Sequence, residues 1–326
     1  MVPYGADGRA ARCAETLASD YKRSQSSPLM AGQKRPSTPA RGARDHAVSV
    51  LNASGFLFQL RVEEEVKAGS TRHAWAVAAR EHPWYHEKTE HSGFADMILA
   101  DGGRGRLVVE CKRSRDAHWY FIVPAEGQAI IRRTPLYWVD DVRIEQSYKG
   151  TRIGWGSVQV LPQTFESSFC IVRGSGENDQ PVLERIGSSL LDCVEAVARE
   201  EVLHQRGTGA INQLAYAPLV VTTATLHVVH CDLPSVSLTT GDIDTAKTTE
   251  VPYLRFRKAL SHRFAWPTRV ATLREIAESR QRTLFVVNAA SLTDFLSKYQ
   301  EARGAEEFPW ELASRAGAPF SDNLWP

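Results

Sequence analysis

Three charged residues lie in two neighbouring apolar segments of the chain, one inside the first segment and two at the end of the second. Asp96 lies inside FADMIL, and after thirteen intervening residues Glu110-Cys111-Lys112 ends RLVVECKR. In an extended strand residues i and i+2 point to the same face, so we expect Glu110 and Lys112 on one side and Cys111 on the other. Two carboxylates and an ammonium that converge can hold a hard divalent cation and stabilise negative charge on a phosphate.

This convergence requires the two segments to pair as strands. Residues 93–100 (GFADMILA) and 106–113 (RLVVECKR) predict strands, and the glycine-rich DGGRG between them predicts a hairpin turn. A carboxylate such as Asp96 among apolar residues is costly to bury without compensation. Mg²⁺, with Mn²⁺ as a substitute, would compensate Asp96 and Glu110 together. Lys112 would then orient or deprotonate a water, or steady the charge that develops on the phosphate.

Other elements must surround this hairpin. The hydrophobic pattern before it predicts a helix at 44–55, a strand at 56–66 and mostly loop at 67–92. The segment from 117 to 172 predicts several further strands. The remaining predicted elements are a helix at 181–205, a buried strand at 217–232 that continues into a hairpin, a helix at 269–282, a strand at 283–289, and a helix at 291–300 opened by Ser291 with Asp294 in capping-box spacing.

Composition limits the class of protein. With 326 residues, 43% hydrophobic and 24% charged, the chain can form one large or two modest domains. No apolar stretch has bilayer length and the first residues lack a signal core, so we expect a cytoplasmic protein that does not enter a membrane. The five cysteines are scattered without CxxC spacing, which argues against a disulfide framework or a zinc cluster. A net charge of +1 means that any nucleic-acid partner must meet a local basic patch.

The motif of Asp96 followed by Glu110-Cys111-Lys112 resembles that of the PD-(D/E)xK nuclease superfamily, although Ala95 stands where the family often has proline. The resemblance implies an α/β restriction-endonuclease-like fold, with a mixed central sheet flanked by helices. A flexible leader (1–43) would precede the nuclease core (44–232), which would hold an insertion at about 117–180, and a C-terminal α/β extension would follow (233–326). The resemblance also implies Mg²⁺-dependent hydrolysis of phosphodiester bonds, with DNA as the expected substrate and a prokaryotic defence or restriction system as the expected context.

Further residues are candidates for the same site. Some family members recruit another acid from the first helix or strand, and Glu64 in the EEE run of 63–65 is our candidate metal ligand, although this run also fits a solvated strand end. His86, His91 and His118 flank the motif strands and could assist with phosphate or protons, but they fit loop histidines as well.

Basic residues suggest where nucleic acid would bind. Arg113 and Arg115 extend positive charge from Lys112. In YLRFRKALSHRF, cations alternate with aromatic rings, as in nucleic-acid grooves, and a solvated strand face explains the run equally well. The candidates for phosphate contact in this run are Arg255, Arg257 and Lys258.

Two other interpretations stay open. The chain could be a catalytically silent, nuclease-derived module that binds nucleic acid with a partner protein, or as a homo-oligomer. Alternatively, Glu110 and Lys112 could form an exposed pair on an edge strand, with Asp96 hydrogen-bonded to a loop. Retention of all three motif residues favours the enzyme. No GxxxxGK[ST], GxSxG or HExxH motif offers a competing activity.

Overall fold

The computed structural model describes residues 41–114, 117–130, 133–145, 148–172, 182–205, 213–260, 272–301 and 311–315. Residues 1–50 and 51–326 form two separate units. Helix α1 (Arg41–Ser54) matches the helix predicted at 44–55. The predicted leader falls outside the described residues up to position 40.

The predicted strand at 56–66 is wrong, because these residues belong to helix α2 (Phe56–Ala68). The alternating pattern of FLFQLRV hid a second pattern, in which Phe58, Val62 and Val66 recur every four residues. Val62 and Val66 are buried and Phe58 packs beside them, as expected for one face of a helix. A 3-10 turn (Gly69–Thr71) follows the helix.

The predicted loop at 67–92 is also wrong, since it contains strand β1 (Ala76–His86). This strand lies at the edge of the sheet and pairs with β2 (His91–Ala100) alone. An edge strand can leave most of its side chains in water, and in β1 only Trp84 and His86 are buried. The strand therefore lacks the apolar pattern by which a strand is recognised in a sequence.

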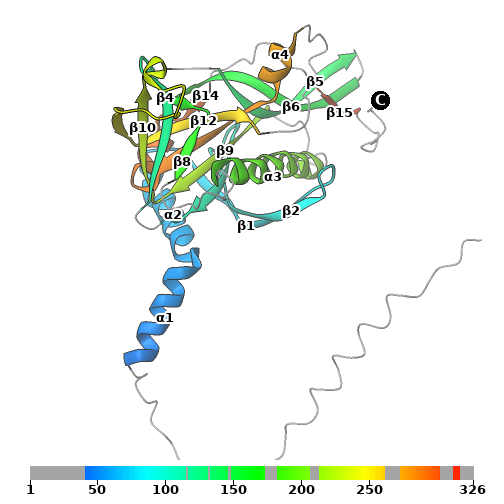
Figure 1. Ribbon diagram of the computed structural model, residues 1–326. Coiled ribbons are helices and arrows are strands. Elements are labelled where there is room, and N and C mark those ends of the chain that lie inside the picture. The colour runs from blue at the N-terminus through cyan, green and yellow to red at the C-terminus, as the bar shows by residue number, and fades with distance from the viewer. Residues whose placement is uncertain are drawn as a thin grey trace, which may run out of the picture. The chain divides into compact units, whose positions relative to one another are not determined.

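The predicted hairpin is confirmed. Strand β2 pairs antiparallel with β3 (Gly105–Lys112), with Met97 opposite Val109. On its other side β3 pairs in parallel with β9 (Leu214–Thr222), with Lys112 beside Thr222. Between β3 and β9 the chain forms helix α3 (Val182–Gln205), which confirms the helix predicted at 181–205. Figure 1 shows α3 beside β1, β2 and β9.

The large sheet extends well beyond the hairpin. Its main path runs β1-β2-β3-β9-β13-β12-β7, and β5, paired with β6, joins the other end of β9. These strands confirm the strand segments predicted within 117–172 and at 283–289. The bounds are β5 (Arg133–Glu145), β6 (Tyr148–Leu161), β7 (Glu166–Ser167), β12 (Tyr253–Ala259), β13 (Gln281–Asn288), β14 (Gln300–Glu301) and β15 (Glu311–Arg315).

A second sheet interrupts the strand predicted at 217–232. The chain leaves β9 at Thr222 and begins β10 (Thr225–Cys231) after two intervening residues, so the segment forms two strands in different sheets. The second sheet has the order β11-β10-β4-β8, and β10 forms an antiparallel pair with β11, the hairpin that was expected. The bounds are β4 (His118–Pro124), β8 (Cys170–Val172) and β11 (Lys247–Val251), with a 3-10 turn at Leu233–Ser235.

The large sheet is covered on both faces. One core cluster joins it to α3 and to the second sheet through residues such as Val194, Phe121 and Leu226. The other joins its opposite face to α2 and α5 (Leu292–Lys298) through residues such as Val66 and Phe295. The protein is therefore an α/β protein with a large mixed sheet flanked by helices.

The C-terminal strands are integrated with this sheet. Strand β13 pairs directly with β9, so β12 and β13 continue the central sheet, while β11 belongs to the second sheet. Helix α4 (Leu273–Ser279) and α5 lie within the helices predicted at 269–282 and 291–300. The predicted capping box is wrong, because the Ser291 side chain makes no cap hydrogen bond. Among the described helices, none is long and apolar enough to cross a membrane.

Candidate active site

The motif residues meet where β2 and β3 separate. The Asp96 carboxylate accepts a hydrogen bond from the backbone N–H of Cys111, with Oδ2 and N 2.6 Å apart. Cys111 is the central residue of the Glu-Cys-Lys motif, so the bond places Asp96 directly beside both Glu110 and Lys112. The last paired residues before this point are Met97 and Val109. Asp96 thus uses its side chain to continue the pairing after the ladder ends.

Glu110 and Lys112 form an ion pair on the same face of β3. The Lys112 Nζ lies 2.5 Å from Glu110 Oε1, and the two side chains are 40% and 23% exposed. Cys111 packs toward the opposite core cluster, as the alternation of a strand predicts. The pair lies on a strand with neighbours on both sides, not on an edge strand.

The environment of Asp96 disfavours its ionised form. Burial, followed by the charge of Glu110, raises the pKa of Asp96 to about 6, although the Cys111 N–H and Lys112 act in the opposite direction. Glu81 adds a further negative charge. The Gln59 amide on α2 donates to the Asp96 carbonyl at 2.9 Å and also to Glu81. The site therefore carries three carboxylates for one nearby ammonium.

A cavity of about 290 Å³ opens beside this site. Glu110 and Lys112 form part of its wall, and Arg185 on α3 lies on the wall as well. Aromatic residues of β1 and β2, Trp84 and Phe94, complete the lining together with apolar residues of α3. The cavity offers both cations and rings next to the carboxylates.

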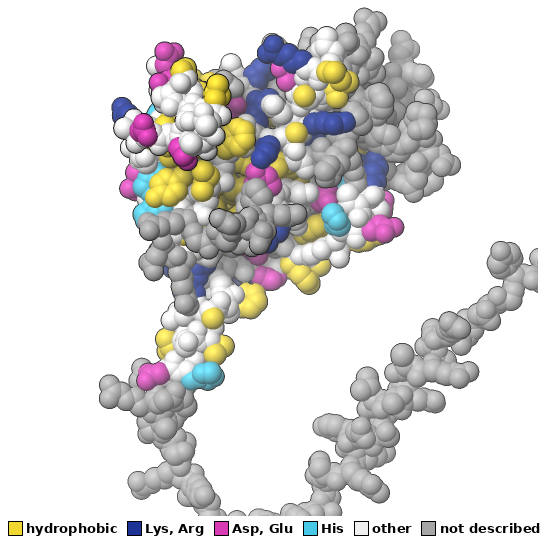
Figure 2. All heavy atoms as spheres, viewed as in Figure 1, with side chains coloured by type: hydrophobic (Ala, Val, Ile, Leu, Met, Phe, Trp, Pro, Cys, Tyr) yellow, Lys and Arg dark blue, Asp and Glu magenta, His cyan; other side chains and the backbone are white. Residues whose placement is uncertain are grey.

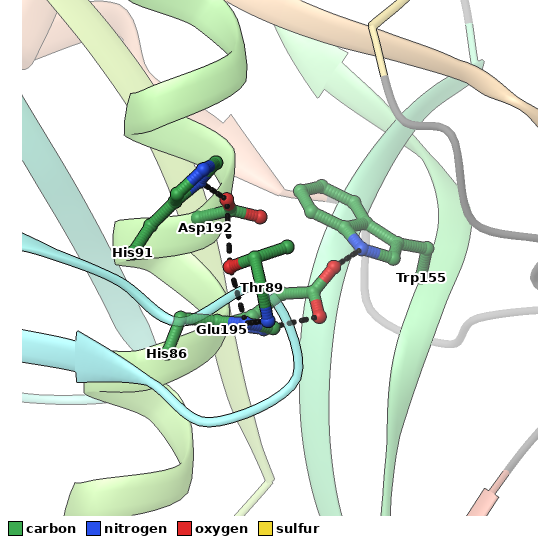
Figure 3. Close-up of polar contacts among 6 residues, drawn as sticks. All are labelled: His86, Thr89, His91, Trp155, Asp192 and Glu195. Carbon is green, nitrogen blue, oxygen red and sulfur yellow. Dashed lines mark hydrogen bonds and ion pairs between the residues drawn. The ribbon is translucent and has the colours of Figure 1, made fainter.

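The turn between β1 and β2 is fastened to α3 by the polar network shown in Figure 3. His86 Nε2 lies 3.3 Å from Glu195 Oε2, and Trp155 of β6 donates to the other oxygen of Glu195 at 2.8 Å. Thr89 donates to Asp192 at 3.1 Å, and His91 lies 2.8 Å from the same Asp192 oxygen. These contacts hold β2, and with it Asp96, at a fixed place relative to the cavity wall on α3.

The network also explains two of the histidines that flank the motif. Burial alone would raise the pKa of Glu195, but its hydrogen bonds with His86 and Trp155 lower this pKa to about 2. His86 and His91 are thus structural residues of the turn. His118 contacts His227 of β10, with 2.8 Å between Nδ1 and Nε2, and lies in the second sheet.

Glu64 is not placed as a metal ligand. The strand on which it was expected is helix α2, and its side chain is 65% exposed and paired with Lys67 at 2.9 Å. Glu63, one residue earlier, is buried and pairs with Lys67 at 2.8 Å and with Arg80 at 3.5 Å. The additional acid that acts on Asp96, besides Glu110, is Glu81 of β1.

Arg255 is a correction among the predicted phosphate contacts. Its side chain is completely buried and donates to the carbonyl groups of Val160 and Pro162, so phosphate cannot reach it. Arg257 donates to Gln281 at 2.8 Å, and Lys258 pairs with Glu184 of α3 at 2.5 Å. The run is a strand, β12, whose cations serve internal contacts.

The other predicted basic contacts are less constrained. Arg113 is exposed directly after β3, and Arg115 lies outside the described residues. Figure 2 shows Lys and Arg side chains scattered over the face that it draws, without one continuous basic stripe.

Three site residues were missed in the sequence. Gln59 and Glu81 lie on segments predicted as strand and loop, so no pattern pointed to them. Arg185 follows Glu184 in the first turn of a predicted helix, where a charged residue is ordinary. Comparisons of the chain with protein-family models, curated proteins and solved structures found no match.

Proposed function

We propose that the chain is a divalent-metal-dependent nuclease with a restriction-endonuclease-like core, which hydrolyses phosphodiester bonds in DNA. The observation that carries the proposal is the hydrogen bond from the Cys111 N–H to Asp96, which brings Asp96 beside Glu110 and Lys112. The sequence motif predicts that these three residues lie close together, but their proximity depends on how β2 and β3 pair.

The order of elements supports the same proposal. Helix α2, the antiparallel strands β1, β2 and β3, helix α3 and the parallel strand β9 follow one another in the order of the family's core. In this order the first core helix is α2 and the first core strand is β1. The sequence had suggested the helix at 44–55 and a strand at 56–66 for these two elements. The segment between β3 and α3 takes the place of the insertion.

The residues present fit a magnesium ion. Asp96 and Glu110 offer the oxygen ligands that Mg²⁺ prefers. Burial and the charge of Glu110 raise the pKa of Asp96, so a cation bound here would favour its ionised form. The described residues contain no group of three or more metal-binding side chains. Two carboxylates suit an ion that keeps several of its waters. When bound, the ion would supply Lewis acidity for attack of water on the phosphodiester.

Lys112 has a separate role in this proposal. Its ammonium holds Glu110 in place in the structure described, and it lies on the cavity wall where a phosphate would enter. There it can stabilise the negative charge that develops on the phosphate during the reaction. Gln59 holds the backbone of Asp96 by its hydrogen bond to the carbonyl oxygen.

The test is a cleavage assay with purified protein on plasmid, single-stranded DNA and RNA, in Mg²⁺, Mn²⁺ or EDTA. We expect cleavage in Mg²⁺ that is lost in EDTA and in Asp96→Ala and Glu110→Ala, while both variants stay folded. Undiminished cleavage in EDTA would contradict the proposal. Binding of nucleic acid without cleavage under any of these conditions would instead favour the catalytically silent module.

A further inference from the structure

The cavity beside the motif is too small for a double helix. Its volume of about 290 Å³ lies at the lower end of the range for small-ligand sites, so one nucleotide unit is the largest piece of a nucleic acid that it could receive. Glu110 and Lys112 line the same cavity. A strand whose phosphate reaches these residues would therefore present a single nucleotide to the cavity.

The walls of the cavity match the two parts of a nucleotide. Phe94 lies two residues before Asp96 and is 64% exposed, an unusual setting for a large aromatic side chain beside a charged site. Exposed rings of this kind stack on unpaired bases, and they do so whatever the base. Trp84 is 7% exposed and packs against Gly93, where an added Cβ would lie 3.2 Å from the indole. Phe94 is thus the ring that is free to stack.

Arg185 supplies a cation for the phosphate. It is exposed on the cavity wall, and no carboxylate among the described residues pairs with it. Its neighbour Glu184 is engaged with Lys258 at 2.5 Å. An arginine that shares the cavity wall with Lys112, and that pairs with no carboxylate among the described residues, favours an anionic ligand. Its planar fork suits phosphate oxygens.

We infer that the cavity takes an unpaired nucleotide of the substrate, with Phe94 stacking on the base and Arg185 contacting a phosphate. The inference rests on the proposed nuclease function and narrows its substrate class to strands that are single, or unpaired at the point of cleavage. An intact duplex keeps its bases stacked and would have to extrude one at a cost of a few kcal/mol.

The test measures binding, so that it does not depend on cleavage. Labelled single-stranded and duplex oligonucleotides, as DNA and as RNA, are titrated by fluorescence anisotropy in Ca²⁺ with wild type, Phe94→Ala, Phe94→Tyr and Arg185→Ala. Phe56→Ala is the matched control, because Phe56 is 62% exposed on α2. Arg274→Ala is the second control, because its side chain is 87% exposed on α4.

We expect tighter binding of single strands than of duplex. Phe94→Ala should weaken single-strand binding about tenfold, Phe94→Tyr should restore it, and Phe56→Ala should change nothing. Arg185→Ala should flatten the slope of log affinity against log salt by about 0.7, the value for one phosphate contact on a single strand. Equal affinity for intact duplex, or a Phe94→Ala variant that behaves like Phe56→Ala, would overturn the inference. Single-strand binding as expected without Mg²⁺-dependent cleavage would overturn the nuclease proposal alone.

Discussion

Asp96 Oδ2 and the backbone nitrogen of Cys111 lie 2.6 Å apart, across the point where β2 and β3 cease to pair. The bond has two consequences. It fixes one carboxylate oxygen in the plane of the sheet, between the positions of Glu110 and Lys112. It also stabilises the ionised form of a carboxylate whose pKa is raised by burial and by the charge of Glu110.

Asp96→Asn should stabilise the protein without metal. The pKa of Asp96 is raised to about 6 from 3.8, so the folded state holds the proton more tightly than the unfolded state does. The ionised carboxylate therefore costs stability above pH 6, and this cost disappears as the pH falls from 6 toward 4. Urea unfolding in EDTA should show Asp96→Asn more stable by about 1–3 kcal/mol at pH 7. The difference should vanish near pH 4, and a variant less stable at pH 7 would contradict this assignment.

Lys112→Ala should separate chemistry from metal binding. Loss of a charge-stabilising group should lower the rate constant of the chemical step by about 10²-fold or more, while Mg²⁺ affinity is largely kept. Single-turnover cleavage and calorimetry measure the two quantities. Lys258→Ala is the control, since Lys258 also forms a 2.5 Å ion pair but with Glu184. Lost Mg²⁺ affinity with normal turnover would refute the role of Lys112.

Glu195→Gln should make stability less dependent on acid. The pKa of Glu195 is lowered to about 2 by His86 and Trp155, with Arg199 adding to the effect. The stabilisation is therefore complete above the ordinary pKa of 4.5 and is lost as the pH falls toward 2. Urea unfolding between pH 7 and pH 3 should show a loss of about 2 kcal/mol from this carboxylate in wild type that is absent in Glu195→Gln. Glu200→Gln is the control, because the Glu200 side chain is 42% exposed beside His82. This variant should lose as much stability as wild type over the same pH range.

Arg255→Ala should damage the fold instead of the substrate path. Its removal leaves the carbonyl groups of Val160 and Pro162 without their donor and opens a cavity beside Phe285. The free energy of unfolding should fall by about 3 kcal/mol or more. Denaturant titration measures the loss, and Arg113→Ala, at an exposed position, should leave stability unchanged. A folded Arg255→Ala variant with a flatter salt dependence of DNA binding would restore the original interpretation of this run.

Local patterns were sufficient for the elements that bury a complete face. The apolar runs of β2, β3 and β13 and the helical spacing of α3 are visible in the sequence because burial requires them. The same patterns failed for α2, whose narrow buried stripe is Phe58, Val62 and Val66, and for β1, an edge strand with few buried side chains. The sequence therefore predicted a strand where helix α2 lies and a loop where strand β1 lies.

By itself the sequence determined the three motif residues, since the face that Glu110 and Lys112 share follows from the period of a strand. Only the tertiary structure decided what surrounds them. Gln59 of helix α2 donates to the Asp96 carbonyl, Glu81 of the edge strand β1 adds its negative charge, and Arg185 of α3 lines the cavity. It also decided that Arg255 is internal, because a cation's burial depends on which carbonyl groups the fold brings to it, and those of Val160 and Pro162 lie more than ninety positions away.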